Sequence, residues 1–309
     1  MSDTPEKEQA AAPQKDAAPP AQLPKADPTK AVVDKAGSPR PAAPRNERWF
    51  ALRAPLPRSV GTLLAIAGPA LLIILWFAVT ATGAVKARDL PSPGETLRAV
   101  LDLWFNEGLP GAIWVSTRRI LISFGLAVAV AVPLGIAMGA FEPINRFFDP
   151  IVAPFRYMPI SAFIPLSLVW FGIYEGQKIA FLWLGVFVYL LPVVVTAIRA
   201  VPEEYVQTAY TLGASRGRVI WSVLIPASLP DIFDAFRVMN AISWTYIVLA
   251  EQVNKRDPPG LGYIVDLGLQ HARPEMAFAI LIVIGLIGIL TDVAINTLNK
   301  VLFPWREKH

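Results

Sequence analysis

The chain has 309 residues, of which 54% are hydrophobic and only 17% are charged, and its mean hydropathy is +0.47. Soluble domains carry charge on about a quarter of their residues, so this composition excludes an ordinary soluble globular protein. With no cysteine and only two distant histidines, His271 and His309, a disulfide framework, a metal site and a His- or Cys-based catalytic centre are all disfavoured. The net charge of +4 is too small to indicate nucleic-acid binding. We therefore predict an all-α integral membrane protein that meets lipid over several helical spans.

The amino-terminal stretch, residues 1–59, is rich in Ala, Pro, Lys, Asp and Glu and has no apolar periodicity. Such a segment buries too little apolar surface to offset the entropy cost of ordering, so we expect a disordered tail. It ends in a basic run, with Arg45, Arg48, Arg53 and Arg58, which favours a cytoplasmic amino terminus. We interpret the tail as solvated chain, with a docking segment for a partner as the alternative.

About six apolar stretches are long enough to cross a bilayer, which takes about 20 residues. In the second stretch, Gly135 and Gly139 are four residues apart, a spacing that predicts close contact with another helix. The third contains Pro154, Pro159 and Pro165, so we expect it to be bent or broken. The predicted spans are residues 60–80, 113–140, 151–173, 179–198, 232–251 and 276–298.

The polar loop between the first two spans, residues 81–112, contains its own helical pattern. Apolar residues recur there at helical spacing after Pro93 and Glu95, which predicts a short amphipathic helix. Arg118 and Arg119 follow at the start of the second span, where we expect their long side chains to reach the lipid headgroups. Six spans and a cytoplasmic amino terminus place the carboxyl terminus in the cytoplasm as well, although the distribution of Lys and Arg adds only a weak bias.

A charged insert, residues 201–226, separates the fourth and fifth spans. Glu203 and Glu204 lie in the first turn of a predicted helix, where carboxylates interact favourably with the helix dipole. Gly213 is placed to end that helix in a left-handed turn, and Ser215 is placed to cap a second helix. The pattern predicts a helix–glycine–helix element that protrudes from the membrane. A loop lying on the headgroups, with its arginines on lipid phosphates, is the alternative.

The insert also matches a known pattern, E-A-A-x3-G-x9-I-x-L-P, over Gln207 to Pro226. It therefore resembles the cytoplasmic signature loop of ABC importer permeases, with Gly213 at the glycine position. Gln207 and Thr208 replace the usual Glu and Ala, so the ATPase contact of that carboxylate is either lost or made by Glu203 or Glu204. Pro226 and Pro230 are expected to close the second helix. The residues that the resemblance implies for ATPase coupling are Glu203, Glu204, Gln207, Thr208, Ala209, Gly213, Ala214 and Arg216.

Four further stretches resemble the permeases of nitrate, taurine and alkanesulfonate importers: LPSPGETLRAVLDLW, PISAFIPLSLVWFGI, VPEEYVQTAYTLGAS and WTYIVLAEQVN…PPGLGYIV. The resemblance covers residues 60–306 and implies the type I ABC importer permease fold in a bacterial cytoplasmic (inner) membrane. It implies two permease copies, two ABC ATPase subunits that hold ATP and Mg, and a periplasmic or extracellular binding protein. The permease itself would have no catalytic site and no cofactor. Its task would be import of a small anion (nitrate, nitrite, cyanate, taurine or another sulfonate) by alternating access.

Polar residues inside apolar spans are costly and are therefore candidates for a translocation path. Arg237, Asn240 and Trp244 share one face of the fifth span at spacings of three and four, and Ser243 lies nearby. Ser161 lies in the third span. A positively lined passage suits a small anion. These five residues are our candidates for the path.

Other charged or turn-forming residues have structural interpretations as well. Arg237 can instead reach the inner interface, and Glu251 is expected at the outer one. Asp292 is expected to form a pair at the inner interface or between helices. The motif GLGY, Gly260–Tyr263, either shapes the docking face for the binding protein or forms a plain Gly/Pro turn.

Two other classes of protein remain as alternatives. An ion-coupled secondary transporter predicts inverted repeats and a central intramembrane carboxylate, and the sequence has neither. A membrane-embedded enzyme requires metal ligands or an activated nucleophile, for which the sequence offers no constellation. The chain also lacks the phosphate loop G-x4-G-K-[ST], so the ATP chemistry must lie on another chain.

Overall fold

The computed structural model describes residues 57–253 and 258–305, and these residues are helical wherever they have regular secondary structure. They fall into two units, Met1–Ile66 and Ala67–His309, and α2 begins in the first and ends in the second. The predicted tail lies almost wholly outside the described residues. The helices are α2 (Arg58–Ala81), α3 (Pro93–Phe105), α4 (Leu109–Ala140), α5 (Glu142–Val152), the 3-10 turns η1 (Ala153–Tyr157) and η2 (Ile160–Phe163), α6 (Ile164–Phe171), α7 (Glu175–Arg199), α8 (Glu203–Thr211), α9 (Arg216–Val219), the π-helical turn η3 (Ile220–Leu224), α10 (Ile225–Gln252), α11 (Leu261–Gln270) and α12 (Pro274–Leu302).

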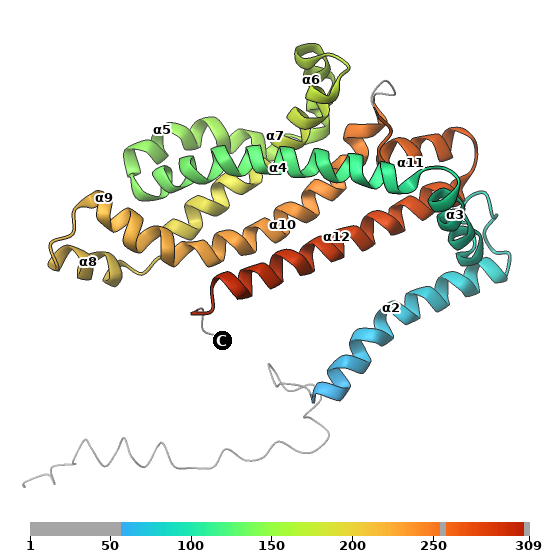
Figure 1. Cartoon of the computed structure of the whole chain (residues 1–309), viewed down its shortest axis with the longest axis horizontal. Helices are drawn as coiled ribbons and strands as arrows, with labels where there is room; N and C mark the ends of the chain where they lie inside the picture. The colour runs from blue at the N-terminus through green and yellow to red at the C-terminus, as the bar shows by residue number, and fades with distance from the viewer. Residues whose placement is uncertain (1–56, 254–257, 306–309) are drawn as a thin grey trace, which may run out of the picture. The chain divides into compact units, whose positions relative to one another are not determined.

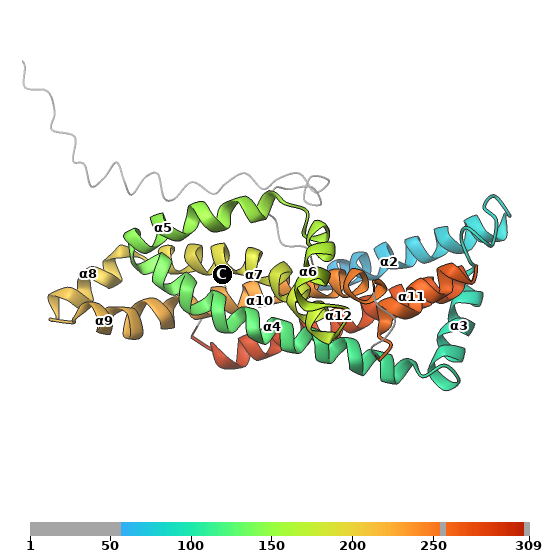
Figure 2. The ribbon, with the colours of Figure 1, turned by 90° about the horizontal axis from the view of Figure 1, so that it is seen from above.

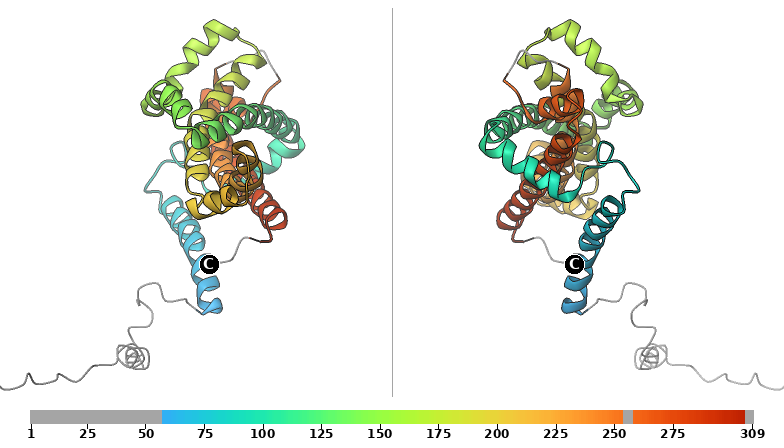
Figure 3. Two further views of the ribbon diagram at one scale, coloured as in Figure 1. Left: turned by 90° about the vertical axis from the view of Figure 1, so that its left-hand side faces the viewer. Right: turned by 90° about the vertical axis from the view of Figure 1, so that its right-hand side faces the viewer.

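Within the second unit, the long helices α4, α7, α10 and α12 run side by side (Figures 1 and 2). The short helices α8 and α9 lie at one end of this bundle, and α3 and α11 lie at the other. We refer to these as the α8 end and the α11 end. Figure 3 views the molecule from each of them.

Five helical segments of the described chain are long and apolar enough to cross a membrane: Ser59–Ala81, Leu109–Ala140, Glu175–Arg199, Arg216–Gln252 and Pro274–Leu302. A sixth candidate span consists of two segments, Glu142–Tyr157 and Ile160–Phe171, which pass the same test together and meet at an angle of 100°. The structure thus confirms about six spans and a break in the third.

The break falls between Met158 and Pro159. Met158 is extended, with φ −84° and ψ 133°, because the ring of a following proline disfavours the helical conformation. The third span begins at Glu142 instead of residue 151. The sequence did not indicate this start, because α5 is amphipathic and has a charged residue in its first turn, so it is not a continuous apolar run.

The second helix of the insert does not close at Pro226 and Pro230, so that prediction was wrong. Helical backbone continues from Arg216 to Gln252 without a break. The π-helical turn at Ile220–Leu224 widens the helix just before Pro226, which relieves the clash of the proline ring with the preceding turn. The second helix of the insert and the fifth span are therefore one continuous helix.

The predicted close approach at Gly135 and Gly139 is confirmed, and its partner is α7. A Cβ atom built on Gly135 would lie 2.7 Å from Val194 Cβ, and one on Gly139 would lie 2.7 Å from Ile198 Cβ. Only glycine allows this separation of the two helix backbones. Ala131 of α4 is buried in the same core cluster as Val194 of α7.

Candidate functional site

The predicted left-handed turn at Gly213 is confirmed. Its φ is +79°, Gly213 N donates to Tyr210 O at 2.9 Å, and Ala214 N donates to Ala209 O at 3.0 Å. This pair of bonds is the Schellman ending of a helix, in which carbonyls of the last turn are satisfied. A Cβ atom on Gly213 would have nothing within 4 Å, so the backbone conformation alone demands glycine there.

The polar residues of α8 face solvent. Glu203, Glu204, Gln207 and Thr208 are all exposed, as is Arg216 at the start of α9. The Gln207 amide donates to Glu203 Oε1 at 3.5 Å, since the two residues are one turn apart. The Thr208 hydroxyl donates to the Glu204 carbonyl at 2.7 Å and is thus engaged within the helix. The insert therefore presents two solvent-exposed carboxylates in the turns before the signature glycine.

Ser215 occupies the predicted cap position of α9, with φ −73° and ψ 159°, but its hydroxyl makes no capping hydrogen bond. The first helix begins at Glu203, because Pro202 has an extended ψ of 132° and takes the N-cap position. The missing Ser215 hydrogen bond is thus a difference from the prediction, and the helix–glycine–helix order stands as predicted.

An open apolar hollow of about 650 Å³ lies on one side of α8. Tyr205, Ala209 and Leu212 line it from the insert, and Val223 and Trp305 line it from η3 and the carboxyl-terminal segment. Leu212, directly after the last residue of α8, is 82% exposed. The hollow lies beside the exposed polar face of the same helix.

On its other side, α8 borders a cavity of about 460 Å³ against the elbow between α4 and α5. Glu142 begins α5 and holds the end of α7 through an Arg199 Nη2–Glu142 Oε2 bond of 2.8 Å. Glu203 and Arg216 line the same cavity from the insert. The insert therefore adjoins the two helix ends that meet at this elbow.

The candidate path residues of α10 are turned toward α12. Arg237 forms two hydrogen bonds with Asp292, at 2.9 and 2.8 Å, which confirms Asp292 as an inter-helix pair. Asn240 Nδ2 and Trp244 Nε1 both donate to Thr291 Oγ1, at 2.9 and 3.2 Å. Arg237, Asn240 and Trp244 thus share one face, as predicted, and form a polar seam between α10 and α12.

The remaining two candidates lie elsewhere. Ser243 is buried, and its hydroxyl donates to the Met239 carbonyl at 2.9 Å. Ser161 lies on η2, directly after the break in the third span, and is exposed. The five candidates are therefore not one cluster: four belong to α10, and Ser161 stands at the break.

At the α11 end, the structure contains a buried ionic cluster that the sequence did not reveal. Arg119 and Glu251 are each only 1% exposed, so the prediction that Arg119 reaches the headgroups was wrong, and Glu251, at the end of α10, is enclosed by protein. Arg119 Nη1 donates to Glu251 Oε1 at 2.8 Å, and Arg119 Nε donates to Glu175 Oε2 at 2.9 Å. The Ser116 hydroxyl also donates to Glu251. Ser116 and Arg119 are three apart on α4 and so face α10 together, a spacing that could have signalled the cluster.

Backbone amides of the GLGY motif donate hydrogen bonds to this cluster. Gly262 N donates to Glu251 Oε2 at 2.8 Å, and Leu261 N donates to Ser116 Oγ at 2.9 Å. A Cβ atom on Gly260 would collide with the Glu251 carboxylate. The two glycines are therefore required because the first turn of α11 lies directly on a buried carboxylate, where the helix N-terminus also favours negative charge.

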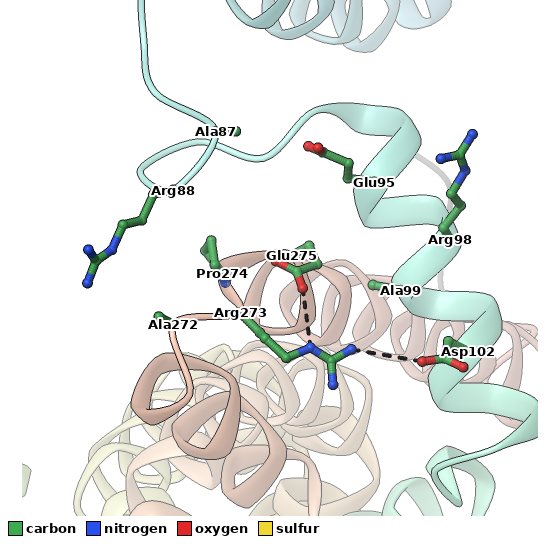
Figure 4. Close-up of a pocket in the computed structure, with 10 residues that line it drawn as sticks. All are labelled: Ala87, Arg88, Glu95, Arg98, Ala99, Asp102, Ala272, Arg273, Pro274 and Glu275. Atoms are coloured by element: carbon green, nitrogen blue, oxygen red, sulfur yellow. Dashed lines mark hydrogen bonds and ion pairs between the residues drawn. The ribbon is translucent and has the colours of Figure 1, made fainter.

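The surface of the α11 end carries a cavity of about 560 Å³ between α3 and the start of α12. Figure 4 shows Arg273 reaching from the α12 side toward Glu275 and Asp102, at 3.3 and 3.9 Å. The helix start predicted from Pro93 and Glu95 is confirmed: α3 begins at Pro93, and Glu95 forms a capping box with Ser92. The Ser92 backbone N–H and hydroxyl donate to Glu95 and lower the pKa of that carboxyl from its ordinary value.

Over residues 57–253 and 258–305, no group of three or more His, Cys, Asp or Glu side chains is placed to hold a metal ion. The described chain concentrates its polar and irregular features at the α8 insert, the break in the third span and the α11 end.

Comparison with known proteins yields a consistent result. A family model described as "Binding-protein-dependent transport system inner membrane component" matches residues 131–308. The taurine transport system permease protein TauC of Escherichia coli (strain K12) is 30% identical over 266 residues, covering 84% of this chain and 94% of TauC. The putative aliphatic sulfonates transport permease protein SsuC of Bacillus subtilis (strain 168) is 27% identical over 266 residues, covering 86% and 96%.

Among solved structures, the inward-facing MetNI methionine ABC transporter matches with a TM-score of 0.55 and 19% identity, over 62% of this chain and 95% of that chain. This likeness shows the shared fold. Together the matches confirm the family resemblance read from the sequence. The chain belongs to the permeases of binding-protein-dependent ABC importers, multi-pass membrane subunits that work with ATPase subunits and a binding protein and have neither catalytic activity nor a cofactor of their own.

Proposed function

We propose that this permease imports a small anion, driven by ATPases that bind the α8 insert. The observation that carries the proposal is the insert itself: a solvent-facing helix that ends in a left-handed glycine at the signature position. TauC and SsuC are named for taurine and aliphatic sulfonates, and all sulfonates carry a compact, singly charged oxyanion. The substrate class we propose is therefore a small sulfonate, with nitrate, nitrite and cyanate as related anions.

The ATPase contacts are Glu203, Glu204, Gln207, Thr208 and Arg216 on the polar face, beside the apolar hollow at Leu212 and Ala209. Gly213 and Ala214 set the turn that follows. We assign the role of the missing signature carboxylate to Glu203. Its carboxylate accepts a hydrogen bond from Gln207, the residue at the signature Glu position, so it lies within one side-chain length of where that carboxylate would be.

Sidedness follows from this assignment. If ATPases bind the insert, the α8 end is cytoplasmic, both termini are cytoplasmic, and the α11 end faces the binding protein across a bacterial inner membrane. The tail, residues 1–59, is then a cytoplasmic extension ahead of a permease domain spanning residues 60–309. The cavity between α3 and α12, with Arg273 on its wall, belongs to the surface that the binding protein meets.

We propose that two copies of the chain enclose the path. Of the five candidates, Ser161 and Arg237 keep exposed surface and are assigned direct contact with the solute. Asn240, Ser243 and Trp244 are buried within the chain and are assigned the indirect role of holding α10 in place.

The experiment that tests the proposal is uptake in proteoliposomes that contain the permease with its ATPase and binding-protein partners. Thermal-shift screening of the binding protein against taurine, alkanesulfonates, nitrate and cyanate identifies the solute. Uptake should require an active ATPase and survive dissipation of the proton gradient. Uptake that persists with an inactive ATPase but stops with the gradient would support a secondary transporter instead.

A further inference from the structure

The break in the third span lies deep in the membrane. Ile160, the first residue after the break to adopt a 3-10 turn, packs on Gly185 of α7: its Cγ2 would be 3.7 Å from a Cβ atom built there. Given the bounds of α7, Gly185 lies about 15 Å from its first residue and about 21 Å from its last. The interrupted backbone is therefore near the middle of the bilayer.

Irregular backbone at this depth is stable only where protein covers it or where it lines a water-filled cavity, since lipid offers no hydrogen-bond partner. The residues at the break are not covered by the rest of the described chain. Tyr157 is 86% exposed, and Arg156 and Ser161 are exposed as well. Phe155 and Phe163 stack at 5.9 Å across the break and hold its two arms together. The exposed residues at the break therefore do not face lipid, and we place them on the water-filled path that the two proposed copies enclose.

A cavity of about 230 Å³ extends from Arg156 between α5 and α7 toward the α8 end. Asn145 and Asp149 line it from α5, and Thr196 and Arg199 line it from α7. Arg156, Arg199 and the Asn145 amide thus face the Asp149 carboxylate in this cavity, whereas the Thr196 hydroxyl donates to the Pro192 carbonyl at 2.9 Å. Cationic groups and N–H donors in one lining favour a small anion.

Of the charged groups that line this cavity, the Arg156 guanidinium is the one without a close carboxylate partner. Its nearest carboxylate oxygen is Asp149 Oδ1 at 3.8 Å, beyond hydrogen-bond distance, and both side chains are partly exposed. Arg199, in contrast, is held by Glu142 at 2.8 Å. Arg156 therefore keeps N–H donors available for another anion, and Asp149 lies close enough to compete with it.

We propose that Arg156, at the break, binds the anionic group of the passing solute and that Asp149 is the counter-ion that this group replaces. The chemical class of the ligand is a small, singly charged oxyanion such as a sulfonate or nitrate. The inference rests on the proposed function for the direction and energy source of transport. The site binds the anion weakly and transiently, because the Asp149 carboxylate stays next to the Arg156 guanidinium and competes for it. This competition releases the anion toward the α8 end.

The chain has no cysteine, so a single introduced thiol can report on this site without background. Ser161→Cys places the reporter at the break, and Leu286→Cys places a control on an exposed apolar side chain at similar depth in α12. Each full-length variant, in membrane vesicles with its ATPase subunits, is labelled with anionic methanethiosulfonate ethylsulfonate and with its cationic trimethylammonium analogue. We expect the anionic reagent to label the thiol at position 161 at least about tenfold faster than the thiol at position 286, since only the first site is wet.

The role of Arg156 is read from the ratio of the anionic to the cationic labelling rate in the Ser161→Cys protein. This ratio should fall about tenfold with Arg156→Gln, stay near its original value with Arg156→Lys, and rise with Asp149→Asn. Arg146→Gln is the matched control, because Arg146 lies on the same helix as Asp149 with its side chain 80% exposed and outside the cavity. Added taurine or nitrate should slow the anionic reagent in the Ser161→Cys protein only.

Equal labelling of the Ser161→Cys and Leu286→Cys proteins, or a ratio that Arg156→Gln leaves unchanged, would overturn the inference. Labelling requires neither ATP hydrolysis nor a known substrate, so it can succeed even if transport proves to be ion-coupled. Conversely, ATP-driven uptake that Arg156→Gln leaves intact would reject the site and keep the proposed function.

Discussion

The Arg119 guanidinium and the Glu251 carboxylate lie 132 residues apart in the chain and 2.8 Å apart in space, with both side chains excluded from solvent. Arg119 also reaches the Pro258 carbonyl at 3.0 Å, and Glu251 accepts the Gly262 amide. One ion pair therefore joins α4, α10 and α11. It fixes the α11 end of the bundle, the surface that we assign to the binding protein.

Removing one member of this pair should be strongly destabilising. Arg119→Gln leaves the buried Glu251 carboxylate without its cation, at a cost of about 3–5 kcal/mol, and Glu251→Gln should cost less because Glu175 still pairs with Arg119. The thermal midpoint of the detergent-solubilised protein, followed by fluorescence-detected size exclusion, measures the loss. Arg118→Gln is the control, since the neighbouring side chain is 47% exposed. Variants of Arg119 and Glu251 as stable as the control would contradict the structural role.

Gly213 is expected to control coupling rather than folding. Gly213→Leu has open space for its side chain but must adopt φ +79°, at a local cost of about 1–2 kcal/mol. That cost shifts the turn after α8 while the span helices stay intact. Substrate-stimulated ATPase activity and uptake should both fall, whereas expression and thermal stability should not. Gly217→Leu, also in open space but at the start of α9 and without a left-handed backbone, should retain both activities.

Glu203 and Glu204 are the two candidates to replace the missing signature carboxylate, and they can be compared directly. Both are exposed and lie in the first turn of α8, but only the Glu203 carboxylate accepts a hydrogen bond from Gln207. Loss of a charged hydrogen bond predicts that Glu203→Gln weakens ATPase association about tenfold or more. Glu204→Gln should change it far less. Co-purification of the ATPase over a salt series measures the difference, and equal effects of the two variants would reject the assignment.

The α4–α7 contact should tolerate no side chain at Gly135. A valine there would meet Val194 Cβ at 2.7 Å, so the helices must separate, at a cost of about 1–3 kcal/mol or more. Gly125→Val, in open space on the same helix, should be nearly neutral. Thermal midpoints of the two variants compare them directly, and a Gly135→Val protein as stable as Gly125→Val would show that the helices are less tightly packed than the structure has them.

Features that depend on local chemistry could be predicted from the sequence. The turn at Gly213 depends on a residue type and its spacing. The break at Pro159 arises because the proline ring disfavours the helical conformation of the residue before it. Both are visible in a short stretch of chain. Span number and membrane character follow from apolar run length in the same way.

Features that depend on contacts between residues far apart in the sequence could not be predicted. The spacing of Ser116 and Arg119 indicates a shared helix face but does not identify Glu251 as the partner, so Arg119 was expected to reach the headgroups and Glu251 to lie at the outer interface. The continuation of the helix past Pro226 was missed because a π-helical turn just before it absorbs the clash, and no residue type signals such a turn. Asn240 and Trp244 were correctly placed on one face, but their shared acceptor, Thr291, lies on another helix.

The unbroken helix from Arg216 to Gln252 has a mechanical consequence. Its 37 residues span about 55 Å at 1.5 Å per residue. On a rod of that length, a tilt of about 5° about one end displaces the other by about 5 Å. If the ATPases bind the insert as we propose, their contact and the Glu251 ion pair lie at opposite ends of one lever, and a movement too small to unfold the insert is long enough to shift the surface that we assign to the binding protein.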